Sequence, residues 1–379
     1  MDADSGVTFL TGFPDSFLAR SVLRTLLENH PRETFVCLIH PHQQSRAEHE
    51  ISTIPEAKAR VHMVQGETFA MDFGLSGRHY LELANTVTRI HHCAATTFLG
   101  ASKSEAKTGN LLATREVLEF AEVSPRLERL VHWSSALVSG KRCGVVREDE
   151  LDGSSGFRNV IEETRFRAER IIKQAGKTLP VTILRPAIIA GDSQTGELDN
   201  TQGLFLLMRL MLSAPGELRI PLPALGDVRL NLAPMDYVVS AGCYLASLDA
   251  ARGLTLHVVD PDPPSSRVVF ELLSNATGHG LMRDSLAGSV LGIVLQAPGM
   301  QRLAPVPRAF LQQALTDVTY DARHASALLE GSGISCPPLD SYVHTFAQYV
   351  RGQPQSHRPP GPLPILNSKS ERARQWSFR

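Results

Sequence analysis

The fold of this 379-residue chain is decided by one stretch near its start, Val7-Thr8-Phe9-Leu10-Thr11-Gly12-Phe13-Pro14-Asp15-Ser16-Phe17-Leu18-Ala19-Arg20. Its first residues are apolar or β-favouring and predict a short buried strand, and Gly12 marks a turn directly after it. Beyond the turn, apolar residues recur at the three-and-four spacing of a helix that ends near Glu28. These residues are Phe17, Leu18, Val22, Leu23, Leu26 and Leu27. The stretch therefore predicts a strand, a glycine turn and a helix.

That order of elements is typical of the opening of a dinucleotide-binding fold, and the same alternation continues along the chain. Apolar runs predict further strands at Phe35–Ile39, Val61–Val64, Arg89–Ala95 (running into a loop), Leu130–Ser134 and Val181–Leu184. Helical patterns lie between them, beginning at His79 and covering Ala106–Ala121 and Asn159–Ile172. Strands that alternate with helices predict an α/β fold with a doubly wound parallel sheet, of the Rossmann-like kind.

The pattern divides the chain into three regions. Residues 1–190 are expected to form a Rossmann-like dinucleotide-binding domain, which the segments near 233–262 rejoin. Beyond Gly191 the pattern is less regular, and residues 191–351 are expected to form mainly a smaller substrate lobe. Residues 352–379 are rich in proline and polar residues, which predicts a disordered tail.

Composition excludes several functional classes. The 38 Lys and Arg residues nearly balance the 39 Asp and Glu residues, so the net charge indicates no nucleic-acid partner. The 5 cysteines include no Cys-x-x-Cys pair, which favours a reducing compartment and gives no support for a metal site. The acidic N-terminus lacks the basic start of a signal peptide, and no apolar run is long enough to span a bilayer. We therefore expect a cytoplasmic protein without a membrane span.

Several motifs together carry a family resemblance. They are Thr11-Gly12-Phe13-Pro14, His92-Cys93-Ala94-Ala95, Asn110, Ser134–Gly140, Phe157-Arg158-Asn159, Leu184–Gly196 and Pro234–Val239. With these motifs, residues 7–351 resemble the extended short-chain dehydrogenase/reductases, and within them the fatty acyl-CoA reductase and thioester reductase branch of male-sterility type. The most specific part is Arg185-Pro186 followed by Gly191-Asp192-Ser193-Gln194-Thr195-Gly196. The resemblance implies a nicotinamide dinucleotide cofactor and the reduction of a carbonyl group.

The resemblance also implies a cofactor-binding set at the ends of the predicted strands. Those residues are Gly12, Phe13, Pro14, Ser16, Phe17, His40, Glu67, Ala94, Ala95, Arg165, Pro186 and Ile188. The glycine turn departs from the family pattern, because Asp15-Ser16 replaces its second glycine. A side chain there takes room from the pyrophosphate, and the Asp15 carboxylate would repel it, so we expect weak or absent binding. Alternatively Asp15 or Ser16 caps the helix, and the two roles are compatible.

The loop after the second predicted strand bears on the choice between NADP and NAD. No acidic residue ends that strand to bind a ribose 2′-hydroxyl, and the sequence continues His40-Pro41-His42-Gln43-Gln44-Ser45-Arg46. Basic groups there favour NADP, with NAD as the alternative, whereas a solvated polar loop explains the same residues equally well. Glu67 stands where the family commonly has an Asp that faces the adenine.

The family reaction uses a Ser or Thr to hold the carbonyl, a Tyr to transfer its proton and a Lys to bind the nicotinamide ribose. Ser135 matches the first role, whereas Ile161 stands at the Tyr position and Arg165 at the Lys position. Four residues apart, Ile161 and Arg165 share one face of the predicted helix 159–172. Ile161 has no proton to give, although Arg165 could still bond ribose hydroxyls. Losing general acid–base catalysis typically costs about 10²–10⁴-fold in rate.

No other residue offers a convincing replacement for the missing proton donor. Strand alternation places His132 on the face opposite to Ser135. Tyr237 and Tyr244 come from a later segment, and a satisfied core role is expected for these two and for His132.

Two hypotheses follow. The first is a degenerate family member that keeps the fold, is catalytically impaired, and acts by binding a small-molecule or acyl ligand or a partner. The partner would be a second copy of the chain or an active reductase. The alternative is an active NADP-dependent reductase of an acyl thioester, aldehyde or lipid-like carbonyl that uses Ser135 and Arg165, with water as the proton source. The apolar runs Leu204–Leu212 and Leu286–Leu295 could line an acyl pocket, against a default of core packing. An epimerase-like activity on the same scaffold has no residue in its favour.

Overall fold

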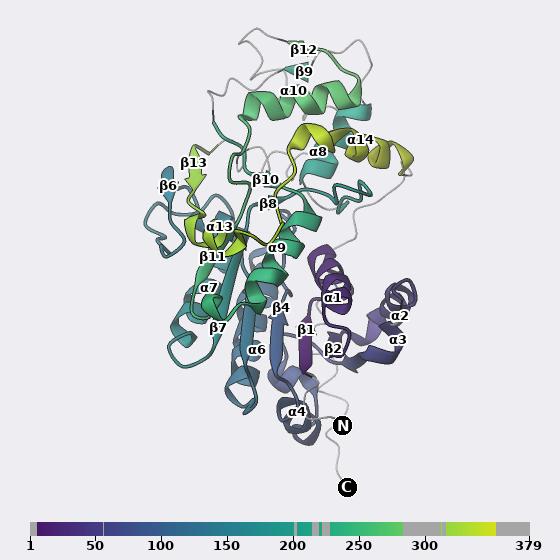
Figure 1. The fold of residues 1–379 in the computed structure, drawn as a ribbon, viewed down its shortest axis with the longest axis vertical. Coiled ribbons are helices and arrows are strands. Elements are labelled where there is room, and N and C mark those ends of the chain that lie inside the picture. Colours follow the sequence, from purple (N-terminus) through teal and green to yellow (C-terminus); the bar gives the residue numbers. More distant parts are fainter. Residues whose placement is uncertain are drawn as a thin grey trace.

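A computed structural model describes residues 6–55, 57–200, 203–213, 220–221, 228–282, 312 and 316–353. In these residues a lower layer of helices surrounds a parallel sheet, and further helices lie above it (Figure 1). The predicted tail beyond 353 and the apolar run Leu286–Leu295 lie outside the described residues.

The lower layer is built on seven parallel strands in the order β11-β7-β5-β4-β1-β2-β3. Their bounds are β1 (Val7–Thr11), β2 (Thr34–Ile39), β3 (Val61–Gln65), β4 (Arg89–His92), β5 (Arg129–Trp133), β7 (Val181–Pro186) and β11 (Thr255–Val258). This sheet confirms the predicted doubly wound α/β fold. Because β1 pairs with β2 on one side and β4 on the other, the strand order reverses between β1 and β4. Ligands of such sheets bind outside the carboxyl ends of the strands at that reversal.

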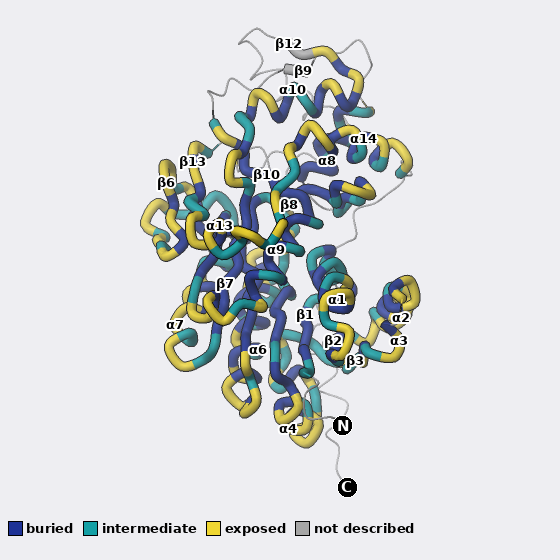
Figure 2. The backbone as a smooth tube through the Cα atoms, viewed as in Figure 1, coloured by how far each residue is buried: buried dark blue, intermediate teal, exposed yellow. Residues whose placement is uncertain are grey.

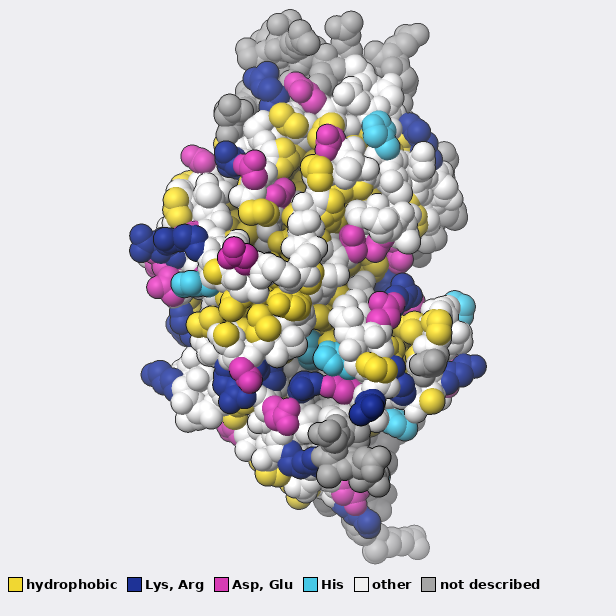
Figure 3. Space-filling view, in the orientation of Figure 1, with side chains coloured by type: hydrophobic (Ala, Val, Ile, Leu, Met, Phe, Trp, Pro, Cys, Tyr) yellow, Lys and Arg dark blue, Asp and Glu magenta, His cyan; other side chains and the backbone are white. Residues whose placement is uncertain are grey.

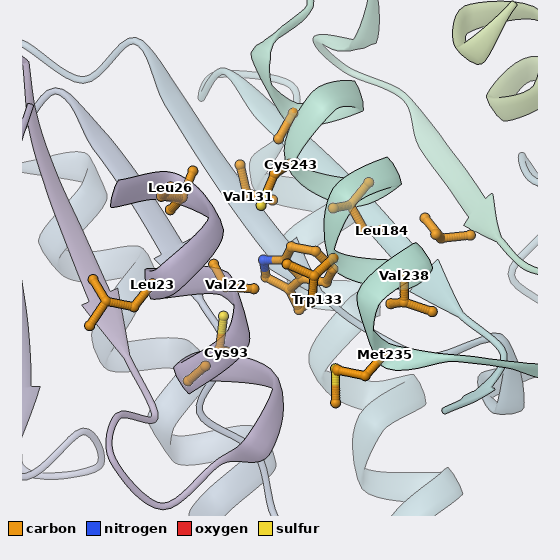
Figure 4. Packing of buried hydrophobic residues seen from close by; sticks show 14 of the residues in the cluster. Val22, Leu23, Leu26, Cys93, Val131, Trp133, Leu184, Met235, Val238 and Cys243 are labelled. Carbon is orange, nitrogen blue, oxygen red and sulfur yellow. The ribbon is translucent and has the colours of Figure 1, made fainter. Parts of the chain in front are cut away.

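Helices cover both faces of the sheet, and the strands between them are largely buried except for the edge strand β3 (Figure 2). One face packs in a single apolar cluster with α1 (Phe17–Asn29), α2 (Gln44–Ser52), α3 (Ala57–Arg60), α9 (Met235–Ser247) and α13 (Arg323–Leu329). The other face packs with α4 (Gly77–Ala84), α6 (Ala113–Glu122) and α7 (Val160–Ala175). On the first face Trp133 lies between α1 and α9 (Figure 4). Gly242 of α9 permits this packing, because a Cβ there would lie 2.3 Å from the Trp133 ring.

The upper helices are α8 (Gly203–Ser213), α10 (Ser266–Thr277) and α14 (Val343–Gly352), which form a separate apolar cluster. Three strand pairs complete the described structure: β6 (Gly144–Val146) with β13 (Val318–Tyr320), β8 (Ile188–Ile189) with β10 (Leu232–Ala233), and β9 (Ile220–Pro221) with β12 (Leu281–Met282). Leu204, Phe205 and Met208 of α8 are buried in that cluster, so this apolar run has the default core role. Within the described residues no helix is long and apolar enough to cross a membrane.

The structure refines several predicted helices. The predicted helix 106–121 begins earlier as α5 (Lys103–Ala106) and passes through a π-helical segment, Lys107–Leu112, before α6. The predicted helix 159–172 continues to Ala175 as α7. Asn159 is its N-cap, because the Asn159 side chain accepts a hydrogen bond from the backbone N–H of Glu162 at 3.0 Å. The helices α2 and α10 were not predicted from the sequence.

Candidate functional site

The reversal point between β1 and β4 brings Gly12 against Ala94. Gly12 has φ +93°, and a Cβ on it would lie 2.8 Å from the backbone nitrogen of Ala94. Only glycine fits that backbone shape and that close approach. The Thr11 hydroxyl, at the end of β1, accepts a hydrogen bond from the Ala94 N–H at 3.2 Å. The two predicted cofactor segments therefore meet at the carboxyl ends of neighbouring strands.

The helix α1 starts at this same point, and Ser16 is its N-cap. The Ser16 hydroxyl accepts from the Ala19 N–H at 3.2 Å, which confirms the capping role for Ser16. The first helical hydrogen bond runs from Arg20 N–H to the Ser16 carbonyl, so the N–H groups of Phe17 and Leu18 precede it. Amides in that position, with the positive end of the helix dipole, suit a phosphate. The rings of Phe13 and Phe17 are buried in the core.

Two of the predicted basic groups after β2, His40 and Arg46, are paired with a carboxylate. His40 Nε2 lies 3.0 Å from Glu67 Oε1, and Arg46 Nη1 lies 3.0 Å from Asp15 Oδ1. Asp15 therefore points to the loop after β2 and does not cap α1. Figure 3 shows basic and acidic side chains next to one another over this part of the molecule. The positive charge that favoured NADP in the sequence is thus balanced locally in the structure.

His92 lies in a buried chain of hydrogen bonds that fixes its protonation. Its Nδ1 lies 2.8 Å from the Thr11 hydroxyl, and its Nε2 lies 3.0 Å from the Thr114 hydroxyl. Thr114 donates its single proton to the Asn110 carbonyl at 2.6 Å, so it accepts from Nε2, and Nδ1 accepts from Thr11. Burial lowers the pKa of His92 well below its usual value, which agrees with a neutral ring.

His132 differs from the prediction of a satisfied core side chain. Its ring stacks on His92 with centroids 5.3 Å apart, and its buried Nδ1 has no hydrogen-bond partner within the described residues. Burial lowers the pKa of His132 to about 3, and the nearby Arg165 guanidinium contributes to the shift. The neighbouring Arg165 comes from α7, and no pattern along β5 predicts that contact. Tyr237, by contrast, is buried and its hydroxyl donates to the Val259 carbonyl at 3.2 Å, as expected of a satisfied core residue.

The π-helical segment carries Asn110 and places it against α7. The Asn110 amide donates to the Thr164 hydroxyl at 2.9 Å, and its Oδ1 accepts from the Thr96 N–H at 2.8 Å. Both bonds are intramolecular, so Asn110 fastens the loop after β4 to α7. A π-helical turn widens the helix at one point and often marks a functional site. The family motif that contains Asn110 has a structural explanation in these contacts.

Ile161 and Arg165 lie on the same face of α7, as predicted. Ile161 is only 5% exposed. Arg165 Nη1 donates to the Ser134 carbonyl at 3.2 Å, and its buried Nε has no partner within the described residues. Burial lowers the pKa of Arg165 to about 10, so the guanidinium remains cationic near neutral pH. The α7 face toward the end of β5 thus presents an aliphatic side chain and an arginine that has N–H groups without a partner among the described residues.

The two serines after β5 have different partners. The Ser135 hydroxyl accepts from the Leu137 N–H at 3.2 Å and caps a short 3₁₀ turn, Ala136–Ser139. Its own proton remains for another acceptor, since a hydroxyl can accept and donate at once. The Ser134 hydroxyl donates to the Glu169 carboxylate on α7.

Glu169 and Arg185 form a buried ion pair that was missed in the sequence. Their side chains are 0% and 1% exposed, and Arg185 Nη2 lies 2.6 Å from Glu169 Oε1. Arg185 also donates to the carbonyls of Glu148 at 3.3 Å and Glu150 at 2.8 Å. The Arg-Pro motif therefore anchors the loop after β6 to the sheet. The sequence did indicate that Glu169 faces the sheet, because Glu169 follows Arg165 by one helical turn on the inner face of α7.

The two later family motifs also meet in space. The Asp236 carboxylate accepts from the Ser193 N–H at 2.9 Å and from the Ser193 hydroxyl at 2.6 Å. Two further predicted cofactor residues, Pro186 and Ile188, lie at the end of β7 and on β8, respectively. Within the described residues, no group of three or more His, Cys, Asp and Glu side chains could hold a metal ion.

Two known reductases are similar in sequence to parts of this chain. Glycine betaine reductase ATRR of Emericella nidulans is 29% identical over 219 residues, which cover 56% of this chain and 17% of that protein. Fatty acyl-CoA reductase 2 of Homo sapiens is 24% identical over 180 residues, which cover 39% of this chain and 34% of that protein. The chain thus corresponds to a minor part of the length of each of these relatives.

Solved structures agree on the fold. The terminal R domain of the myxalamid PKS-NRPS biosynthetic pathway superposes with a TM-score of 0.81 at 24% identity, covering 94% of each chain.

A sequence profile of the male sterility protein family matches residues 10–242, which is more than half of the chain. These findings confirm the resemblance to the extended short-chain dehydrogenase/reductases and their thioester reductase branch. The chain therefore belongs to the male sterility protein family of NAD-binding domains.

Proposed function

We propose that this chain binds a nicotinamide dinucleotide and a carbonyl ligand of the thioester or aldehyde class, and that it is impaired in reducing that ligand. The observation that carries the proposal is Ile161, a buried aliphatic side chain on the α7 face where the family has its tyrosine. A hydrocarbon side chain can neither give nor take a proton.

The residues at the β1–β4 reversal fit the cofactor. The absence of a Cβ at Gly12 leaves the backbone close to Ala94, and the amides of Phe17 and Leu18 face the same end of the sheet. These groups would hold the pyrophosphate. Arg165 is only partly buried and has guanidinium N–H groups beyond the one bonded to the Ser134 carbonyl, which would be available to a ribose hydroxyl. When bound, the cofactor supplies a hydride to a carbonyl carbon.

The chain's own residues would bind and orient a carbonyl better than they would protonate it. The Ser135 hydroxyl keeps a proton that can be donated to a carbonyl oxygen in a hydrogen bond. Arg165 contributes positive charge but holds its proton firmly, since its pKa is about 10. We therefore infer a binding role, alone, as a homodimer or together with an active reductase. The relatives named as reductases support the ligand class.

The test restores the missing pair and includes a control that differs by one hydroxyl. The variants are Ile161→Tyr/Arg165→Lys and Ile161→Phe/Arg165→Lys, assayed for oxidation of NADPH and NADH with an acyl-CoA or an aldehyde. We expect the tyrosine variant alone to gain roughly 10²–10⁴-fold over the wild type, the usual contribution of a general acid. Cofactor binding is measured by calorimetry in parallel.

Each other outcome decides between the hypotheses. A wild-type rate equal to that of the tyrosine variant would support the alternative, an active reductase that uses Ser135 and Arg165. A failure of the wild type to bind either dinucleotide would refute the cofactor part of the proposal.

A further inference from the structure

Asp15 lies at the one place where the glycine turn departs from the family pattern, and its side chain bridges two loops. Its Oδ1 accepts from Arg46 Nη1 at 3.0 Å, and its Oδ2 accepts from the side-chain amide of Gln43. Gln43 and Arg46 belong to the segment that follows β2, whereas Asp15 follows β1. The carboxylate therefore connects the ends of two neighbouring strands.

The backbone on both sides of Asp15 is held, so the direction of its side chain is a fixed feature of the turn. Ser16 caps α1 through its hydroxyl. Arg20 Nη1 donates to the carbonyl of Pro14 at 3.1 Å and to that of Asp15 at 3.4 Å. The Asp15 side chain is 34% exposed, so a ligand at this end of the sheet can reach it.

Arg46 lies where it could bind the 2′-phosphate of NADP, and this arginine is paired with Asp15. In doubly wound folds the adenosine ribose lies over the end of the second strand, where an acidic residue binds the 2′-hydroxyl or an arginine accommodates a 2′-phosphate. This chain has His40 at the end of β2, and His40 is itself paired with Glu67 at 3.0 Å. Arg46 is the arginine on the first turn of α2. Asp15 thus occupies the cation that a 2′-phosphate would use.

We propose that Asp15 determines the cofactor specificity of this chain, by supplying from the β1–α1 turn the carboxylate that is missing at the end of β2. This inference rests on the proposed function, which requires that a dinucleotide binds. A ribose 2′-hydroxyl can donate to the Asp15 carboxylate, whereas a 2′-phosphate must displace Asp15 from Arg46 and remain beside a like charge. The chain therefore favours NADH over NADPH.

The experiment compares the dissociation constants of NADH and NADPH by calorimetry for the wild type and Asp15→Asn. We expect the ratio of the two constants to move toward NADPH by up to roughly fivefold, since an exposed ion pair is worth at most about 1 kcal/mol, which corresponds to that factor. Added salt should weaken the preference of the wild type.

Two variants control for general effects on charge and folding. Glu50→Gln removes a carboxylate that pairs with Arg20 at 3.6 Å nearby, and it should leave the NADH/NADPH ratio unchanged. Arg46→Gln in the Asp15→Asn background should cancel the gain in NADPH affinity. Thermal melting shows whether each variant is folded.

The outcomes separate this inference from the function on which it rests. If both cofactors bind and the ratio stays within about twofold in Asp15→Asn, the role of Asp15 is refuted while cofactor binding stands. If the wild type already prefers NADPH, the role of Asp15 is equally refuted. If neither the wild type nor Asp15→Asn binds either dinucleotide, the proposed function fails and this inference fails with it.

Discussion

Replacing Glu169 by glutamine tests whether the buried ion pair with Arg185 holds the end of β5 and the loop after β6. The substitution keeps the shape of the side chain but leaves the Arg185 charge without a counter-ion at a site where both side chains are at most 1% exposed. Removing one partner of a buried pair costs about 3–5 kcal/mol. Arg185 keeps its backbone carbonyl acceptors at Glu148 and Glu150, so we expect the lower end, about 3 kcal/mol.

The assay is urea unfolding followed by tryptophan fluorescence, because Trp133 lies in β5 directly before Ser134. The matched control is Glu82→Gln, which breaks the exposed pair of Arg78 and Glu82 on α4. An exposed helical pair of this kind contributes about 0.3–0.5 kcal/mol. If the two variants lose the same free energy of unfolding, the buried pair does not hold the fold and the reasoning is wrong.

Three further predictions concern stability. First, His132 and His257 have pKa values lowered by burial to about 3 and about 4, against about 6.5 unfolded, so the unfolded state binds protons that the folded state excludes. The free energy of unfolding should therefore fall as pH drops from 6.5 to 5, by about 1.4 kcal/mol per pH unit for each such histidine, and His132→Gln should lessen this slope in urea titrations. Second, Gly242→Ala should destabilise the protein by about 1–3 kcal/mol despite alanine's better helix propensity, because its Cβ would meet Trp133 at 2.3 Å; a higher melting temperature would contradict this. Third, Asn159→Ala should cost about 1 kcal/mol through loss of the α7 cap, whereas Asn159→Asp should retain most of the stability in the same thermal melts.

Local patterns in the sequence were sufficient to predict the sheet and much of the site. Apolar runs predicted the strands β1 to β5 and β7, and three-and-four spacing predicted the helix α7, because each of these elements is marked by its own apolar residues. Gly12 could be predicted as a turn residue because glycine adopts backbone conformations that strain other residues. The structure gives Gly12 such a conformation, with φ +93°. Asn159 could be predicted as a cap because capping depends on neighbours three residues away.

Contacts between distant segments could not be predicted in this way. The partner of Asp15 is 31 residues along the chain, and a carboxylate near a glycine turn gives no local sign that an arginine on α2 will bind it. The charge of His40 and Arg46 therefore favoured NADP in the sequence, although both side chains have acidic partners in the folded chain. The lack of a hydrogen-bond partner for His132 Nδ1 among the described residues is of the same kind, since it depends on which α7 side chains lie beside β5.

The anchoring of α7 explains how the helix accommodates an isoleucine at position 161, where the resemblance led us to expect the family's tyrosine. Arg165 donates to the Ser134 carbonyl and Glu169 accepts from the Ser134 hydroxyl, so two successive turns of α7 hold the end of β5. Neither contact involves residue 161, which is buried one turn earlier. An aliphatic side chain there adds apolar burial, worth about 1.5–3 kcal/mol, and leaves the anchor intact. The polar contacts that hold α7 to β5 therefore come from residues other than Ile161, and substitutions at Ile161 should not release the helix from the sheet.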